Sequence, residues 1–200
     1  MLSYLLDAFS GPAAPFLYAL LVILGFSIAV LIERVYTLLG ARVDAAAVFT
    51  RVEAALKAGS TPELGKTPLE NVIAAGLAQA DPELGWEAMQ AAAVDAEQRI
   101  RQRIPYLASV ASISTMVGLF GTVYGLIRAF AAMGGVAAAE RAARLSEGSS
   151  TAMAATAFGL FVAIPALAAH SVLDSQARSM LAAIEATAGR VHVLRRGLAR

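Results

Sequence analysis

The chain lacks cysteine altogether and has only two histidines among its 200 residues. Without cysteine there is neither a disulfide framework nor a thiolate metal site. His170 and His192 are far apart and have no partners at ligand spacing, so the sequence predicts no zinc site. Charge is scarce too: 16% of the residues are charged, against about 25% in soluble domains. The net charge of +1 gives no reason to expect nucleic-acid binding.

Apolar residues, by contrast, make up 58% of the chain. Three windows carry no Asp, Glu, Lys or Arg: 8–32, 104–127 and 148–173. About 20 apolar residues suffice for a helix to cross the hydrocarbon core, and each mid-bilayer charge costs roughly 2.5–3.5 kcal/mol. We therefore expect an all-α membrane protein with three transmembrane helices. A soluble Ala-rich bundle with buried helices is the alternative.

Basic residues predict the direction of these spans. Residues 33–103 hold eight Lys or Arg and the tail after 173 holds five, whereas the loop after the second span holds Arg141 and Arg144. The positive-inside rule then places the first two of these regions in the cytoplasm. The start MLSYLLDAFSGPAAP lacks the basic region of a signal peptide, so we expect the first span to be retained. The expected segments are: N-terminus outside, 1–15; first span, 16–39; cytoplasmic region, 40–103; second span, 104–128; outer loop, 129–148; third span, 149–173; cytoplasmic tail, 174–200.

The cytoplasmic regions are expected to be helical extensions of the spans. Apolar spacing predicts a helix over 43–58 that stops at Gly59. Pro68 is expected to open a second helix through Ala80. Asp81 and Pro82 then read as the cap and first residue of a third helix through Arg103, while Pro105 either kinks that helix or marks the membrane entry. The tail should continue the third span.

Small residues form a stripe at helical spacing in each of the last two spans. Such stripes allow helices to approach closely in lipid, where no hydrophobic drive brings them together. The residues expected to pack in this way are Ser114, Gly118, Gly121, Gly125, Gly159 and Pro165. Pro165 is interpreted either as a tolerated kink or as a residue that shapes a cavity.

Two hydroxyls, Thr122 and Thr156, lie deep in the same spans. Each hydroxyl could simply bond a backbone carbonyl or join two helices. Alternatively, both could face a lumen and pass on a proton. Threonine does not titrate, and no ionisable residue of this chain lies deep in a span, so a partner would have to supply a carboxylate. Glu147 lies at the outer mouth of the third span, as an ion collector or as a solvated helix end. Glu33 and Arg34 are interpreted as interfacial anchors.

The segments ASVASISTMVGLFGTVYGLIRAF (108–130) and STAMAATAFGLFVAIPALAAH (150–170) resemble the signature spans of the MotA/TolQ/ExbB proton-channel family. The loop TPLENVIAAGLAQ (67–79) is similar to that family as well. The expected topology is like that of its ExbB/TolQ branch. The resemblance covers nearly the whole chain.

The resemblance implies a five-subunit ring in the bacterial inner membrane with a periplasmic N-terminus. The ring would enclose an ExbD/TolR-like single-span partner that carries a membrane aspartate. Thr122 and Thr156 match the family's pore threonines. The family's glutamate five residues before the third-span threonine is replaced by Thr151, which leaves open whether Glu147 takes that role. A proline common in the second span of that branch is replaced by Thr115.

The function expected from this resemblance is that of a motor subunit which couples proton flow to work in the periplasm or at the outer membrane. The choice of H⁺ or Na⁺ as the translocated ion is open, and no other cofactor is expected. The alternative is a non-conducting scaffold that positions a partner. An intramembrane enzyme is not expected, because the spans hold no nucleophile–base pair and no metal ligands.

Overall fold

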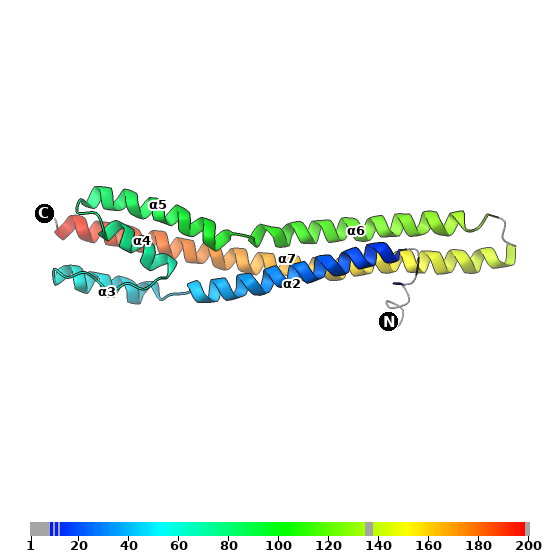
Figure 1. Ribbon diagram of the computed structural model, residues 1–200, viewed down its shortest axis with the longest axis horizontal. Helices are drawn as coiled ribbons and strands as arrows, with labels where there is room; N and C mark the ends of the chain where they lie inside the picture. Colours follow the sequence, from blue (N-terminus) through cyan, green and yellow to red (C-terminus); the bar gives the residue numbers. More distant parts are fainter. Residues whose placement is uncertain (1–8, 10, 12, 135–137, 199–200) are drawn as a thin grey trace. The chain divides into compact units, whose positions relative to one another are not determined.

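The computed structural model describes residue 9, residue 11, residues 13–134 and residues 138–198, and every regular element in these ranges is an α-helix. The helices are α2 (Ala14–Ala41), α3 (Ala45–Lys57), α4 (Pro68–Leu77), α5 (Pro82–Arg101), α6 (Ile104–Ala131) and α7 (Ala138–Leu198) (Figure 1). Among them, α2, α6 and α7 contain stretches long and apolar enough to cross a membrane. The expected all-α class with three candidate spans is confirmed.

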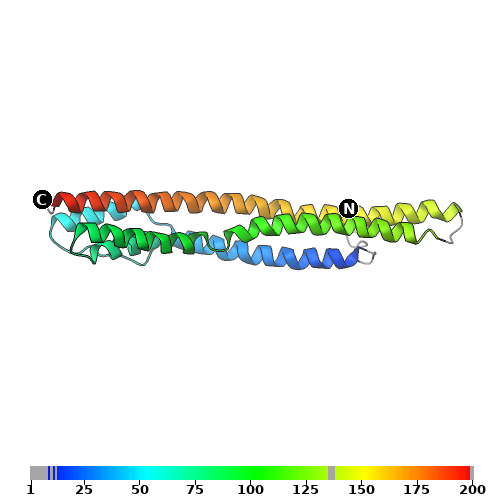
Figure 2. The same ribbon diagram turned by 90° about the horizontal axis from the view of Figure 1, so that it is seen from above.

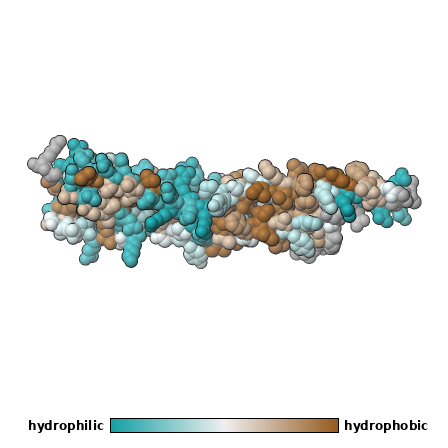
Figure 3. All heavy atoms as spheres, turned by 45° about the horizontal axis from the view of Figure 1, so that its top comes forward, coloured by the Kyte–Doolittle hydropathy of each residue, from teal (hydrophilic) through white to brown (hydrophobic). Residues whose placement is uncertain are grey.

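The chain divides into two compact units, and α2 and α7 contribute residues to both. The first unit comprises residues up to Ile32 together with Arg103–Ser171, and the second comprises Glu33–Gln102 together with Val172–Arg200. In the first unit the exposed surface is rich in large apolar side chains, such as Phe120, Phe161 and Ile164. On the face shown in Figure 3, hydrophobic residues gather over this unit, whereas hydrophilic residues dominate the second.

The short helices of the second unit begin at residues that cap them. The Asp44 carboxylate accepts from the N–H groups of Ala46 and Ala47 ahead of α3, and Gly59 follows α3 with a φ of +67°. A positive φ at the position after a helix suits glycine, which has no Cβ to clash. The Asp81 carboxylate accepts from the N–H of Glu83, with Pro82 as the first residue of α5. These features confirm the expected stop after α3 and the expected start of α5.

Two helix ends differ from expectation. α4 ends at Leu77, three residues before Ala80, and α5 ends at Arg101, before Arg103. Arg103 has a φ of 64° and precedes α6, and Pro105 lies in the first turn of α6. Proline is well tolerated there because the first N–H groups of a helix have no partner inside it. Pro105 therefore belongs to the start of a new helix and does not kink α5.

α7 continues through Pro165 without a break in its helical assignment. Proline inside a helix removes one backbone hydrogen bond, but neighbouring turns and helices can compensate in a membrane segment. α6 reaches Ala131, and α7 starts at Ala138. Figures 1 and 2 both show α6 and the first half of α7 side by side, which is where the candidate site lies.

Candidate functional site

Glycines bring the backbones of α6 and α7 into close approach. A Cβ added at Gly118 would lie 2.9 Å from the Ala155 carbonyl oxygen and 3.1 Å from the Gly159 Cα. A Cβ added at Gly159 would in turn lie 2.7 Å from the carbonyl oxygen of Ser114. Real Cβ atoms do not come so close to backbone atoms, so only glycine fits at these crossing points. The small-residue stripes expected from the sequence lie at this contact.

The contact continues turn by turn toward the C-terminal end of α6 and the N-terminal end of α7. A Cβ at Gly121 would lie 2.8 Å from the Cβ of Ala155, and a Cβ at Gly125 would lie 2.8 Å from the Cβ of Ala152. Ala152 and Ala155 are themselves fully buried. Pro165 lies further along α7, and its side chain is exposed, outside this contact. The glycines and alanines thus make a continuous close seam of about three helical turns.

Thr122 and Thr156 face each other across this seam. Their hydroxyl oxygens are in direct hydrogen-bond contact, although 34 residues separate them in the chain. The Thr122 hydroxyl also lies 3.1 Å from the carbonyl oxygen of Ala152 on α7 and 3.3 Å from that of Gly118 on its own helix. The Thr156 hydroxyl lies 3.2 Å from the same Gly118 oxygen. Both side chains are half-buried in the single chain.

The hydroxyls of Thr122 and Thr156 have two hydrogens between them but take part in four close oxygen–oxygen contacts. A hydroxyl has one hydrogen to donate and two lone pairs to accept with. At most two of the four contacts can therefore be donated hydrogen bonds at any moment. The cluster can rearrange between several donor patterns, and it can accept a further hydrogen from outside. Such an arrangement can relay a proton, but it cannot hold a charge.

Ser114 adds a third hydroxyl to the same seam. Its side chain is fully buried, and among the described residues its Oγ has no hydrogen-bond partner. An unsatisfied buried hydroxyl costs about 1–3 kcal/mol. Thr115, its neighbour, is exposed, and its hydroxyl donates to the Ala111 carbonyl of its own helix, at 3.0 Å. Ser114 and Thr115 therefore differ in environment although they are adjacent in the sequence.

The expected entrance residues are only partly described. Thr151 and Glu147 lie within α7, but their side chains fall outside the part of the chain that the structure describes. Gly148, next to Glu147, packs closely on Ala129 of α6, which places the backbone of this turn on the same seam.

Arg34 is not an interfacial anchor, contrary to expectation. Its side chain is only 4% exposed, and it donates to the carbonyl oxygens of Gln102 at 2.9 Å and Arg99 at 3.4 Å. It also pairs with Glu33 at 2.8 Å. Carbonyl groups at a helix end have no partner inside the helix and carry partial negative charge. Arg34 of α2 therefore caps the end of α5, a long-range contact that the sequence pattern does not reveal.

Glu70, which the sequence analysis did not single out, is buried at the start of α4. Its Oε2 accepts from the Thr67 hydroxyl at 2.6 Å, and its Oε1 lies 3.5 Å from Nη1 of Arg51. The Thr67 hydrogen bond above all, with backbone N–H groups of Gly65 and Thr67 and the charge of Arg51, lowers the pKa of Glu70, while burial opposes this shift. The pattern Thr-x-x-Glu is that of a capping box and could have revealed the pair in advance.

Arg195, also missed, joins α7 to the end of α4. Its guanidinium donates to the carbonyl oxygens of Gly76 at 2.8 Å and Gln79 at 2.5 Å, and to that of Ala80 at 3.3 Å. Gly76 and Gly85 allow α4 and α5 to cross closely beside it: a Cβ at Gly85 would lie 2.8 Å from the Gly76 oxygen. No local signal in the sequence marks this arginine.

Comparison with known proteins adds independent evidence. The model of the MotA/TolQ/ExbB proton channel family matches residues 64–186. The Tol-Pal system protein TolQ of Pseudomonas aeruginosa is 33% identical over 140 residues, which cover 62% of this chain and 59% of that protein. TolQ of Haemophilus influenzae is 44% identical over 77 residues, covering 38% of this chain and 33% of that protein.

A second named group of relatives matches as well. The biopolymer transport protein ExbB of Salmonella typhimurium is 37% identical over 91 residues, which cover 44% of this chain and 36% of that protein. In each of these comparisons the chain spans less than two thirds of the relative's length. The family match includes both α6 and the part of α7 that carries Thr156.

Proposed function

The chain belongs to the MotA/TolQ/ExbB proton channel family, and on that premise we propose that it is a ring subunit of a proton-driven motor in the bacterial inner membrane. Its three apolar helices make it a multi-pass membrane protein. The proposal places the N-terminus in the periplasm and the second compact unit in the cytoplasm. Five copies would surround a single-span partner of the ExbD/TolR type. Proton flow would release roughly 2.3 kcal/mol per charge per 100 mV of membrane potential for work in the periplasm or at the outer membrane.

One observation carries this proposal: the hydroxyls of Thr122 and Thr156 meet each other inside the seam of two membrane helices. The cluster has more oxygen acceptors than hydrogens, so it can take a hydrogen from a protonated carboxyl group and pass another one on. The chain has no ionisable residue at this depth, so the carboxyl group comes from the partner. Glu147 and Thr151 are proposed to form the outer entrance of the same path.

The test is proton flux into liposomes that contain the chain and its single-span partner. Thr122→Val and Thr156→Ala should abolish flux while the complex still assembles, and Thr156→Ser should retain flux because it keeps a hydroxyl. Thr115→Val is the matched control, since its hydroxyl donates to its own helix. Full flux in both the Thr122 and Thr156 variants would rule the proposal out. Repeating the assay with Na⁺ gradients decides between H⁺ and Na⁺.

A second function, that of a non-conducting scaffold, is favoured by a different aspect of the same cluster. Thr122 contacts the Ala152 carbonyl and Thr156 contacts the Gly118 carbonyl, so each hydroxyl joins α6 to α7 within one chain. Interhelical bonds of this kind stabilise membrane bundles by about 0.6 kcal/mol each. A scaffold predicts that the threonine variants weaken the helix pair and that no partner-dependent flux exists in the unmodified protein.

A further inference from the structure

Two of the open grooves along α7 in the second compact unit lie against α3 and α5. One groove, with a volume of about 570 Å³, lies between α7 and α3 and is lined by Phe49, Ala186, Gly189, Arg190, Val193 and Leu194. The other, with a volume of about 460 Å³, lies between α7 and α5. Trp86, Gln90, Val94, Leu181 and Glu185 are among its lining residues.

The two grooves are lined by side chains of opposite charge. Among the residues that the structure describes, Arg190 is the charged residue that lines the α3 groove, where its guanidinium lies 6.0 Å from the ring centre of Phe49. The α5 groove is lined by Glu97 and Glu185. Val193 is 69% exposed in the first groove and Val94 is 56% exposed in the second. Each groove therefore presents an exposed valine beside charge of the opposite sign to the other groove.

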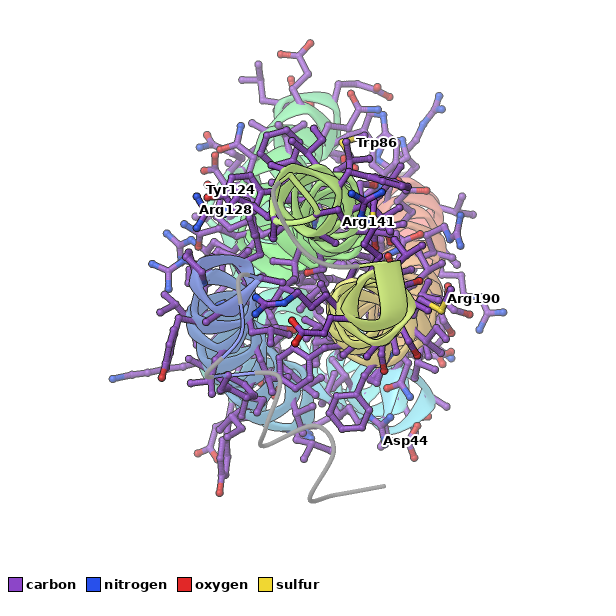
Figure 4. The ribbon with its side chains drawn as sticks, turned by 90° about the vertical axis from the view of Figure 1, so that its right-hand side faces the viewer. Asp44, Trp86, Tyr124, Arg128, Arg141 and Arg190 are labelled. Atoms are coloured by element: carbon purple, nitrogen blue, oxygen red, sulfur yellow. The ribbon has the colours of Figure 1, made fainter. Side chains whose placement is uncertain are left out.

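The grooves face different directions around α7. At 3.6 residues per turn, Ile184 and Glu185 lie roughly half a turn around the helix from Ala186 and Arg190. Viewed along the helices in Figure 4, Trp86 of α5 and Arg190 of α7 are correspondingly seen at different positions around α7. One molecule thus presents two different, complementary surfaces, which is what a head-to-tail contact between identical copies requires.

We propose that the α3 groove of one copy docks against the α5 groove of the next copy, with the Arg190 side chain of the first reaching toward Glu185 of the second, which lies about 7.5 Å away along the helix axis. This inference rests on the proposed function, because it specifies how the ring of that motor closes in the cytoplasm. The occupant is a second copy of this chain, since the same helix supplies both complementary charges.

The level of each residue along α7 identifies which positions should meet. Trp86 lies beside His192, with ring centres 5.1 Å apart, and Arg101 lies 3.5 Å from Asp174. α5 therefore runs antiparallel to α7, and Gln90 lies about level with residue 188. Gly189 is then within about 1.5 Å of the same level. In a ring whose axis follows α7, Gln90 of one copy and Gly189 of its neighbour face each other.

Disulfide trapping tests this contact cleanly because the chain has no cysteine of its own. Gln90 is exposed, and a Cβ at Gly189 would meet nothing within 4 Å, so both positions accept cysteine. In oxidised membranes the double variant Q90C/G189C should give a ladder of covalent multimers. Co-expressed single variants Q90C and G189C should give a dimer and nothing larger. The matched control A91C/G189C, with the first cysteine turned by about 100° around α5, should remain monomeric.

Charge reversal provides the second readout. E185R and R190E should each reduce the ladder several-fold, and the double reversal E185R/R190E should restore it, since close charge pairs across an interface set the register of docking. Only dimers from Q90C/G189C would show a symmetric contact and overturn the proposal. Only monomers, in a sample that chemical cross-linking shows to be oligomeric, would show another occupant and overturn it too. Neither result touches the threonine assay, so failure of the docking contact is distinguishable from failure of the motor.

Discussion

The Nη1 atom of Arg195 lies 2.8 Å from the carbonyl oxygen of Gly76, across 119 residues of sequence. Together with the bonds to Gln79 and Ala80, this contact neutralises the carbonyl end of α4 with a guanidinium from α7. α4 has only ten residues, fewer than the roughly 12–15 that an isolated helix needs to be stable in water. Contacts from elsewhere in the chain therefore decide whether α4 forms.

We expect Arg195→Met to loosen α4. Loss of hydrogen bonds from a charged donor costs about 1–3 kcal/mol, so amide hydrogen exchange within α4 should speed up about tenfold or more. The matched control is Arg196→Met. Arg196 pairs with Glu83 at 3.3 Å, but both side chains are more than half exposed, and such pairs contribute about 0–1 kcal/mol. Equal exchange rates in both variants would contradict the proposed role of Arg195.

Arg34→Met is expected to destabilise the end of α5. The substitution keeps an apolar stem but leaves the Gln102 and Arg99 carbonyls without their donor. We expect the free energy of unfolding to fall by about 1–3 kcal/mol. Thermal unfolding in detergent, monitored by circular dichroism, should show a lower midpoint. Arg42→Met serves for comparison because Arg42 is exposed and its guanidinium donates to the side chain of Gln176. If both variants have the same thermal midpoint, Arg34 does not act as a cap.

The seam between α6 and α7 should not tolerate a methyl group. Gly118→Ala would bring a Cβ within 2.9 Å of the Ala155 carbonyl oxygen, and overpacking of this kind costs about 1–3 kcal/mol. Gly25→Ala is the control, because nothing lies within 4 Å of its added Cβ, and it should be neutral or gain up to about 1 kcal/mol. Unfolding in detergent measures both. A neutral Gly118→Ala variant would mean that the helices do not approach so closely.

Acidic pH should remove the contribution of Glu70 to the free energy of unfolding. Because the folded state lowers the pKa of this group, the unfolded state binds more protons than the folded state once the pH falls toward about 4.5, the ordinary value for glutamate. The stabilisation is complete above that ordinary pKa and is lost as the pH drops through the folded value. Thr67→Val removes the main cause of the shift, so its stability should depend less on pH in this range. Thr61→Val, at an exposed position, should behave like the unmodified protein.

Local signals explain how much of the fold was predictable. Gly59, Pro68 and Asp81-Pro82 predicted helix ends or starts from the chemistry of single residues, and the described helices stop or start there. The charge-free windows predicted the apolar helices because insertion of a helix into a bilayer depends on local composition. Helix ends without such a residue, at Leu77 and Arg101, were missed by two or three positions.

Long-range contacts explain what was not predictable. Periodicity put Thr122 and Gly118 on one stripe of α6, but it could not say which residue of α7 would oppose them. The burial of Arg34 and the reach of Arg195 depend on which helix ends meet in space. A basic residue beside a span is ordinarily exposed, so the sequence alone favoured an anchor at position 34.

The position of Arg195 also bears on the order of events during synthesis. A ribosome that adds about 5–20 residues per second needs roughly 6–24 s to travel the 119 residues from Gly76 to Arg195. Throughout that interval the carbonyl groups at the end of α4 lack the guanidinium of Arg195, and the segment is accessible to chaperones and proteases. α4 therefore gains this contact only after the C-terminal part of α7 has been synthesised, whatever the speed at which the apolar segments enter the bilayer.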